Sequence, residues 1–314
     1  MKLHQNEALF EELIELAAKQ YNLPSNAVRK DYFITMILNH LQNSSYFEHV
    51  VFKGGTSLSK CYPGSIERFS EDIDLTYIPQ VGMTYKQINK ELKAIEKQLI
   101  GFGKTEKIST ERNDRNKSSY VWFTDKYKDI ERIKLEIGSS VRPHPYSVKE
   151  LQSYIHDYLE QINENDAIKE FQLRKIHVNV LNIERTFIDK LMSVKRHAIC
   201  GSLHSKVRHI YDVVALSEMK EIKDFLNDKS KLKEIVQITK QTDSAYLVKR
   251  AIPKDYNPEG LYDFDTWKEK FSIEIRANYE DLHNTLLYTN QKQEWINDGK
   301  VFSKINQLLI EINE

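Results

Sequence analysis

The feature that most constrains the fold of this chain is a glycine pair that interrupts a short apolar run. Residues 50–52 (Val-Val-Phe) have the composition of a buried strand, and the glycines at 54–55 stop it. The polar residues 56–60 that follow are typical of the start of a short helix. Residues 72–78 then alternate between acidic or polar and apolar side chains, which predicts a second strand. The sequence therefore predicts an α/β unit in which a strand, a glycine turn and a helix start are followed by an acidic strand.

The acidic strand carries two carboxylates on one face. A period of two places Asp72 and Asp74 together, on the side opposite Ile73 and Leu75. Such a pair can hold Mg²⁺ (or Mn²⁺), a hard cation that bridges to nucleotide phosphates rather than filling an all-protein cage. Taken alone, the pair also fits a solvated sheet face. The adjoining glycine turn favours the metal, because backbone amides at a helix start suit a phosphate oxygen.

A third carboxylate lies on a predicted strand at 133–137. Alternation there buries the isoleucines and the leucine and turns Lys134 and Glu136 to the other face. If this strand is a neighbour of 72–78, Glu136 completes the acidic trio that two-metal nucleotidyl transfer uses. An edge-strand pair of Lys134 and Glu136 facing water fits the pattern equally well.

The rest of the chain divides into two parts. Apolar spacing predicts helices at 7–19, 27–42 and 85–101, strands at 120–123 and 176–181, and a polar loop at 113–119. From about residue 184 onward the patterns are almost exclusively helical. We therefore expect an α/β (α+β) domain with a mixed sheet and flanking helices over 1–183, followed by an all-α helical bundle over 184–314.

The bundle contains many large apolar side chains at helical spacing. We expect them to form its core rather than a binding platform; they are Trp267, Phe271, Tyr279, Leu286, Leu287, Trp295 and Phe302.

Composition narrows the function classes. The 46 basic and 46 acidic residues cancel, which removes the general polyanion-binding signal of a basic protein. A mean hydropathy of −0.58 and the lack of a long apolar run exclude a membrane span. The N-terminal residues lack signal-peptide features, and the 2 cysteines, Cys61 and Cys200, have no metal-ligand spacing. We expect a cytoplasmic protein with free thiols.

Four motifs in order resemble one known family. GGTSLSK (54–60) and RFSEDIDL (68–75) are similar to the signature of the AbiEii/AbiGii nucleotidyltransferases, the toxins of abortive-infection and toxin–antitoxin pairs. ERTFIDKL (184–191) and RHIYD (208–212) resemble the family's later lysine helix and its Arg-x-x-x-Asp element. The resemblance implies a polymerase-β-like nucleotidyltransferase domain ahead of the helical bundle.

The resemblance also implies roles for individual residues. Gly54, Gly55, Thr56 and Ser57 would cradle a nucleoside triphosphate (NTP), while Asp72, Asp74 and Glu136 would bind the metal. Lys190 would contact phosphate and stabilise developing charge, Arg208 would join it in binding the nucleotide, and Asp212 would orient Lys190 or the nucleotide. The third acid is Glu136 rather than the Asp common in active polymerase-β-like enzymes, so its part in catalysis stays open.

Without the resemblance, the same residues have simpler interpretations. Arg208 and Asp212, four residues apart on a helix, would form an exposed ion pair of about 0.3–0.5 kcal/mol, and Lys190 would be solvated. We expect His197 and His209 to be surface or supporting groups, because this chemistry does not require an imidazole.

We expect a Mg²⁺-dependent enzyme that transfers NMP from an NTP to RNA, such as a tRNA 3′ end, as the toxin of a pair with a separate antitoxin. The acceptor RNA is suggested by a basic stretch, which contains Arg185, Lys190, Lys195, Arg196, Lys206 and Arg208. Two alternatives stay open. The acceptor is a protein side chain or a small molecule, or the chain is a nucleotide-binding or partner-binding module without turnover. The presence of both Asp72 and Asp74 argues against a module without turnover, because two neighbouring negative charges repel each other unless a metal ion lies between them.

Overall fold

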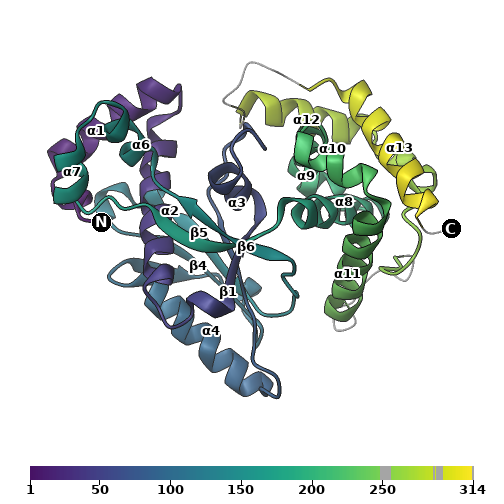
Figure 1. Cartoon of the computed structure of the whole chain (residues 1–314), viewed down its shortest axis with the longest axis horizontal. Helices are drawn as coiled ribbons and strands as arrows, with labels where there is room; N and C mark the ends of the chain where they lie inside the picture. Colours follow the sequence, from purple (N-terminus) through teal and green to yellow (C-terminus); the bar gives the residue numbers. More distant parts are fainter. Residues whose placement is uncertain (248–255, 286, 288–292, 313–314) are drawn as a thin grey trace. The chain divides into compact units, whose positions relative to one another are not determined.

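The computed structural model describes residues 1–247, 256–285, 287 and 293–312 (Figure 1). The chain forms two compact units, and each is described here by itself. The first comprises Met1–Cys61 and Phe69–Leu181, and the second comprises Tyr62–Arg68 and Asn182–Glu314. The division after Leu181 lies close to the expected one after residue 183. The inclusion of Tyr62–Arg68 in the second unit had no counterpart in the sequence patterns.

The first unit is built on a seven-stranded sheet with the order β3-β4-β5-β2-β1-β7-β6. Its strands are β1 (Val50–Lys53), β2 (Ile73–Tyr77), β3 (Lys104–Lys107), β4 (Asn116–Trp122), β5 (Ile133–Gly138), β6 (Tyr146–Leu151) and β7 (Ile176–Leu181). The pairs β2–β5 and β1–β7 are parallel, and the other neighbours are antiparallel. The predicted mixed sheet is therefore confirmed.

Helices flank this sheet. They are α1 (Glu7–Tyr21), α2 (Ser25–Gln42), α3 (Gly54–Cys61), α4 (Tyr85–Ile100), α5 (Lys128–Glu131), α6 (Tyr154–Gln161) and α7 (Asn165–Glu170), with short 3₁₀ turns at Leu3–Gln5, Phe47–His49, Ser109–Glu111 and Asp125–Tyr127. Helix α2 is the central one, because it packs against β7, α1, α4, α5 and α6. Every residue from 27 to 38 is buried, including three charged ones.

Among the described residues of the second unit, helices are the regular elements, joined by turns and loops, and Arg68 and Leu287 form one isolated bridge. It contains α8 (Ile183–Ile199), α9 (Val207–Ser217), α10 (Lys220–Asn227), α11 (Lys229–Leu247), α12 (Ile273–Thr285) and α13 (Trp295–Glu311), with 3₁₀ turns at Leu203–Lys206, Phe264–Thr266 and Lys268–Lys270. The expected all-α part is present in this unit.

The predicted aromatic core of the bundle is confirmed in part. Trp267, Tyr279 and Phe302 are fully buried. Leu286 lies outside the described residues, and Leu287 is half-buried. The remaining two aromatic residues, at 271 and 295, are partly exposed and line a pocket.

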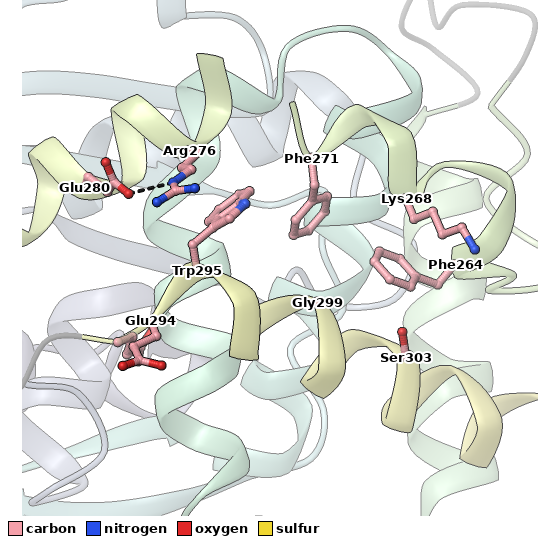
Figure 2. A pocket seen from close by; sticks show the side chains of 10 residues that line it. Phe264, Lys268, Phe271, Arg276, Glu280, Glu294, Trp295, Gly299 and Ser303 are labelled. Carbon is pink, nitrogen blue, oxygen red and sulfur yellow. Dashed lines mark hydrogen bonds and ion pairs between the residues drawn. The ribbon is translucent and has the colours of Figure 1, made fainter. Parts of the chain in front are cut away.

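That pocket has a volume of about 950 Å³ and lies within the second unit (Figure 2). Phe264, Phe271 and Trp295 form aromatic walls. Arg276 and Glu280 also line it and form an ion pair of 2.7 Å across one turn of α12. None of the predicted site residues lines this pocket, so the candidate site lies elsewhere.

Three sheet predictions were wrong or missing. The expected loop at 113–119 ends early, because β4 begins at Asn116 and pairs with β5 from there. Strands β3 and β6 were not predicted, since β3 consists of exposed polar residues and β6 is only partly buried.

Within the part of the chain that the structure describes, no helix combines the length and apolar character needed to cross a membrane.

Candidate active site

The strand order places the predicted acids beside each other. Asp74 on β2 is paired in register with Glu136 on β5 and with Lys53 on β1. Paired residues of neighbouring strands point to the same face of a sheet, so these three side chains form one row. Asp72 immediately precedes β2 and, like Asp74, is half-buried. The condition for the acidic trio, that the strand of Glu136 lies next to the acidic strand, is met.

The glycine turn lies against the acidic strand. Gly54 has φ +89°, a backbone conformation that side chains disfavour, and a Cβ added there would lie 2.3 Å from Asp74 Oδ2. Only glycine therefore allows α3 to begin beside this carboxylate. The first backbone amides of an α-helix have no partner within the helix and lie at the positive end of the helix dipole, so the first turn of α3 is suited to anions.

Hydrogen bonds of the two hydroxyl groups fix this turn. Thr56 Oγ1 donates to Ser70 Oγ at 3.0 Å, which ties the turn to the residues leading into the acidic strand. Ser57 Oγ donates to the Gly54 carbonyl at 2.9 Å. Both side chains are buried, whereas Gly54 and Gly55 are partly exposed. In this arrangement the backbone of the turn, rather than its hydroxyls, faces outward.

The electrostatics of Glu136 reflect its neighbours. Burial raises the pKa of Glu136, and the negative charge of Asp74 raises it further, while an ion pair with Lys134 opposes both effects. Lys134 also contacts Glu111 at 2.8 Å. Asp74 and Glu136 thus lie side by side on one face of the sheet, and Lys134 pairs with Glu136. A divalent cation would relieve this repulsion.

The residues fit a Mg²⁺ ion that is shared with a substrate. Among the described residues, no three His, Cys, Asp or Glu side chains are grouped so as to hold a metal by themselves. Mg²⁺ does not require such a cage, since one or two carboxylates plus substrate phosphates usually bind it. Asp72 and Asp74, next to the glycine turn, meet that requirement, while Glu136 is held by Lys134.

In the second unit, a buried carboxylate joins two cations. Asp212 on α9 is 0% exposed. Arg68 donates to it twice, from Nε to Oδ1 at 2.6 Å and from Nη2 to Oδ2 at 2.8 Å, and Lys190 Nζ donates to Oδ2 at 2.6 Å. Burial alone would raise the pKa of Asp212, but the charges of Arg68 and Lys190 outweigh it and hold that pKa well below its usual range. We call these three residues the buried triad.

The buried triad excludes the simpler interpretations of this region. Asp212 is fully buried, so it does not form an exposed helix pair with Arg208, and Lys190 is 5% exposed rather than solvated. Arg208 itself has an exposed side chain on α9. Sequence reasoning gave Arg68 no role, although its position in the RFSEDIDL motif was a signal.

Half of the six cations in the basic stretch are buried. Arg185, Lys190 and Lys195 are buried, and Arg196 forms a 2.9 Å ion pair with Asp243. The net positive charge of this stretch in the sequence therefore overstates the positive charge that a polyanion would meet.

Two histidines of this region, His197 and His209, have lowered pKa values. Burial lowers the pKa of His197 to about 4, aided by nearby cations, and its Nδ1 lies 2.8 Å from Ser202 Oγ. Burial likewise lowers the pKa of His209 well below its usual range, and Lys190 adds to the effect. Both rings are neutral at physiological pH. His209 is half-buried, and its Nδ1 is buried.

Comparison with known proteins identifies the family. The family model described as "Nucleotidyl transferase AbiEii toxin, Type IV TA system" matches residues 36–295. The chain belongs to this family of nucleotidyltransferase toxins from toxin–antitoxin systems. No curated protein matches the sequence.

Two solved structures are similar over most of their length. MenT4, a nucleotidyltransferase toxin from Mycobacterium tuberculosis H37Rv, is 16% identical with a TM-score of 0.49, covering 95% of this chain and 98% of its own. A putative nucleotidyltransferase from H. pylori is 20% identical with a TM-score of 0.37, covering 83% of this chain and 98% of its own.

Proposed function

We propose that this toxin is a Mg²⁺-dependent enzyme that transfers NMP from an NTP to a hydroxyl group of an RNA, with a tRNA 3′ end as the first acceptor to test. The observation that carries the proposal is the close approach of the glycine turn to the acidic strand, with Gly54 directly against the Asp74 carboxylate. Anion-binding amides and cation-binding carboxylates side by side suit the two components of a metal nucleotide.

The first unit would bind the nucleotide and the metal. Asp72 and Asp74 would hold Mg²⁺ (or Mn²⁺). When bound, this ion would neutralise part of the phosphate charge. The backbone amides of residues 54–57 would receive the triphosphate. In the transfer step, the acceptor oxygen bonds to the α-phosphorus, the bond to the bridging oxygen breaks, and pyrophosphate leaves.

Glu136 would act on the acceptor hydroxyl. Its raised pKa makes it a better proton acceptor than an ordinary carboxylate, and its place beside Asp74 is suited to orienting the hydroxyl or taking its proton. The alternative for this residue is a supporting role through Lys134, and Glu136→Ala separates the two. A loss of transfer below about tenfold would assign Glu136 the supporting role.

The second unit would contribute charge. Lys190 would contact phosphate and stabilise the charge that develops there, and Asp212 would hold its ammonium group in place through the 2.6 Å bond. Arg208, which is exposed, would add to nucleotide or RNA binding together with the half-buried Lys206. A separate antitoxin would be the protein partner, as the family implies.

The test is incubation of the purified protein with Mg²⁺, total bacterial RNA and each of the four α-labelled NTPs in turn. We expect label in RNA with the wild type. Asp72→Asn and Asp74→Asn should each abolish it, because an amide cannot replace the charge of a metal-binding carboxylate, and both variants should stay folded. Full activity in either variant would defeat the metal-site assignment.

The other outcomes identify the alternatives. Label that appears in protein or in a small molecule after addition of cell extract keeps the chemistry but changes the acceptor. If NTP binds and no acceptor becomes labelled, the chain is a nucleotide-binding module without turnover.

A further inference from the structure

Helix α2 contains three consecutive charged residues in its buried stretch. Arg29, Lys30 and Asp31 are 5%, 9% and 6% exposed. Buried charges are costly unless they are paired, and each of the three has an ion-pair partner. Because an α-helix turns by 3.6 residues, consecutive side chains leave it in three different directions. The three pairs therefore tie α2 to three different parts of the first unit.

Lys30 reaches the segment that leads into the acidic strand. Its ammonium group pairs with Glu71, the residue directly before Asp72. Burial lowers the pKa of Lys30, and the charge of Asp72 partly offsets this, so the lysine lies within electrostatic range of the metal-binding carboxylate. The charge of Glu71 is thereby compensated by a lysine.

Asp31 reaches the helix that begins with the glycine turn. Its Oδ1 pairs with Lys60, the penultimate residue of α3, and its Oδ2 accepts a hydrogen bond from Tyr154 N at 2.8 Å. Lys60 Nζ also donates to the Gln152 carbonyl at 3.0 Å. Both members of this pair are buried, with side-chain exposures of 8% and 7%. The far end of an eight-residue helix is thus fixed, and its first turn holds the glycines.

Arg29 has partners elsewhere. It pairs with Glu11 on α1 and lies 3.5 Å from Glu131 on α5, and its guanidinium stacks over the Tyr127 ring at 4.5 Å. It is as buried as Lys30 and Asp31, but these partners lie on α1, on α5 and at Tyr127 rather than in the glycine turn or the acidic strand. It provides a matched comparison on the same helix.

We infer that Lys30 and Asp31 are positioning residues that fix the metal-binding strand and the phosphate-binding turn relative to one another, through Glu71 and Lys60. The inference deepens the proposed function and rests on it for its kinetic consequence. Because adjacent residues of one rigid helix hold both segments, a shift of either segment changes the distance between metal and phosphate sites. Misplacement by about 1 Å can cost a hundredfold in rate.

The test compares full-length Lys30→Met and Asp31→Asn with the matched Arg29→Met. Hydrogen exchange of peptides is followed first, since it requires no activity. Lys30→Met should speed exchange in residues 69–77 by about tenfold or more, and Asp31→Asn should do so in 54–61, whereas Arg29→Met should leave both segments at wild-type rates. Glu71→Gln and Lys60→Met remove the partners instead, and they should reproduce the two patterns if a variant of α2 itself fails to fold.

Kinetics then separate positioning from general destabilisation. With labelled NTP, Lys30→Met should lower kcat at least about tenfold with little change in KM, and Asp31→Asn should mainly raise the KM for NTP. Lys30→Arg, which keeps the charge, should recover most of the loss. Arg29→Met should lower the melting temperature while leaving both constants unchanged.

The outcomes are separable. Wild-type exchange in both segments of the Lys30 and Asp31 variants, or unchanged kinetics despite faster exchange, would overturn the inference. If the wild type transfers no NMP to any acceptor, the proposed function fails, and the exchange pattern alone still decides whether the two residues fix the segments.

Discussion

Asp212→Asn tests the buried triad most directly. The substitution keeps the shape of the side chain but removes its charge and replaces one acceptor oxygen with a donor nitrogen. Arg68 and Lys190 then lose the carboxylate to which they donate three hydrogen bonds of 2.6–2.8 Å. Two buried cations thereby lose the counter-charge of Asp212.

The expected cost follows from this burial. Removing one partner of a buried ion pair typically costs about 3–5 kcal/mol, because the remaining charge is left uncompensated. No reduction for solvent screening applies, since Asp212 is 0% exposed. At roughly 2–4 °C per kcal/mol for a chain region of this size, the transition of the second unit should fall by roughly 6–20 °C.

Thermal unfolding followed by circular dichroism and tryptophan fluorescence measures this change. Asp224→Asn is the matched control, because it makes the same substitution in an exposed pair with Lys220 on α10 of the same unit. The control should melt with the wild type. If Asp212→Asn melts within about 2 °C of the wild type, the cations do not depend on this carboxylate and the reasoning is refuted.

The pH dependence of the same comparison has a defined sign. Because the folded pKa of Asp212 is lowered, its stabilisation is fully present above the ordinary Asp pKa of about 3.9 and is lost as the pH falls below it. The difference in stability between wild type and Asp212→Asn should therefore stay constant from about pH 8 to 5 and narrow only below about pH 4. A difference that closes already above pH 5 would contradict the lowered pKa.

Three further outcomes are expected. Gly54→Ala and Gly82→Ala both place a side chain at φ +89°, which should lower the free energy of unfolding by about 1–2 kcal/mol in each variant. Only the Cβ at position 54 meets a carboxylate oxygen, at 2.3 Å, so only Gly54→Ala should lose NMP transfer. Because the folded pKa of Glu136 is raised above its unfolded value, its ionisation destabilises the fold relative to the unfolded chain as the pH rises. Glu136→Gln in EDTA should therefore melt above the wild type at pH 8, and the difference should shrink as the pH falls toward about 4. Lys190→Met should lower the rate of NMP transfer by about a hundredfold or more. It should lower the melting temperature less than Asp212→Asn does, because Asp212 keeps its pairing with Arg68. An equal fall in melting temperature in both variants would make Lys190 a structural residue.

Hydrophobic periodicity predicted the helices and strands that bury one face. The stripe at 27–42 became α2 (Ser25–Gln42), and the alternation at 133–137 became β5 (Ile133–Gly138). Strand β3 (Lys104–Lys107) was not predicted, because all four of its residues are exposed and show no apolar alternation. Its backbone pairing with β4 holds it in the sheet, and backbone pairing leaves no trace in hydropathy.

The site was predictable residue by residue but not as an arrangement. Alternation showed which face Asp74 and Glu136 occupy, yet the parallel pairing that brings them together depends on strand order, which the patterns do not encode. Helical spacing placed Asp212 on a polar face and suggested exposure. Asp212 is instead buried and paired with Arg68, 144 positions earlier in the chain, a contact that no local pattern could indicate.

The short segment Tyr62–Arg68 has a consequence for recombination of the gene. It belongs to the second unit although it lies in sequence between the glycine turn and the acidic strand, so the chain passes between the units three times, after residues 61, 68 and 181. A gene fragment ending at the apparent boundary would carry Arg68 without Asp212, its buried counter-ion. A single crossover at residue 181 would therefore separate Arg68 from Asp212, and a recombinant that keeps both units intact needs more than one exchange.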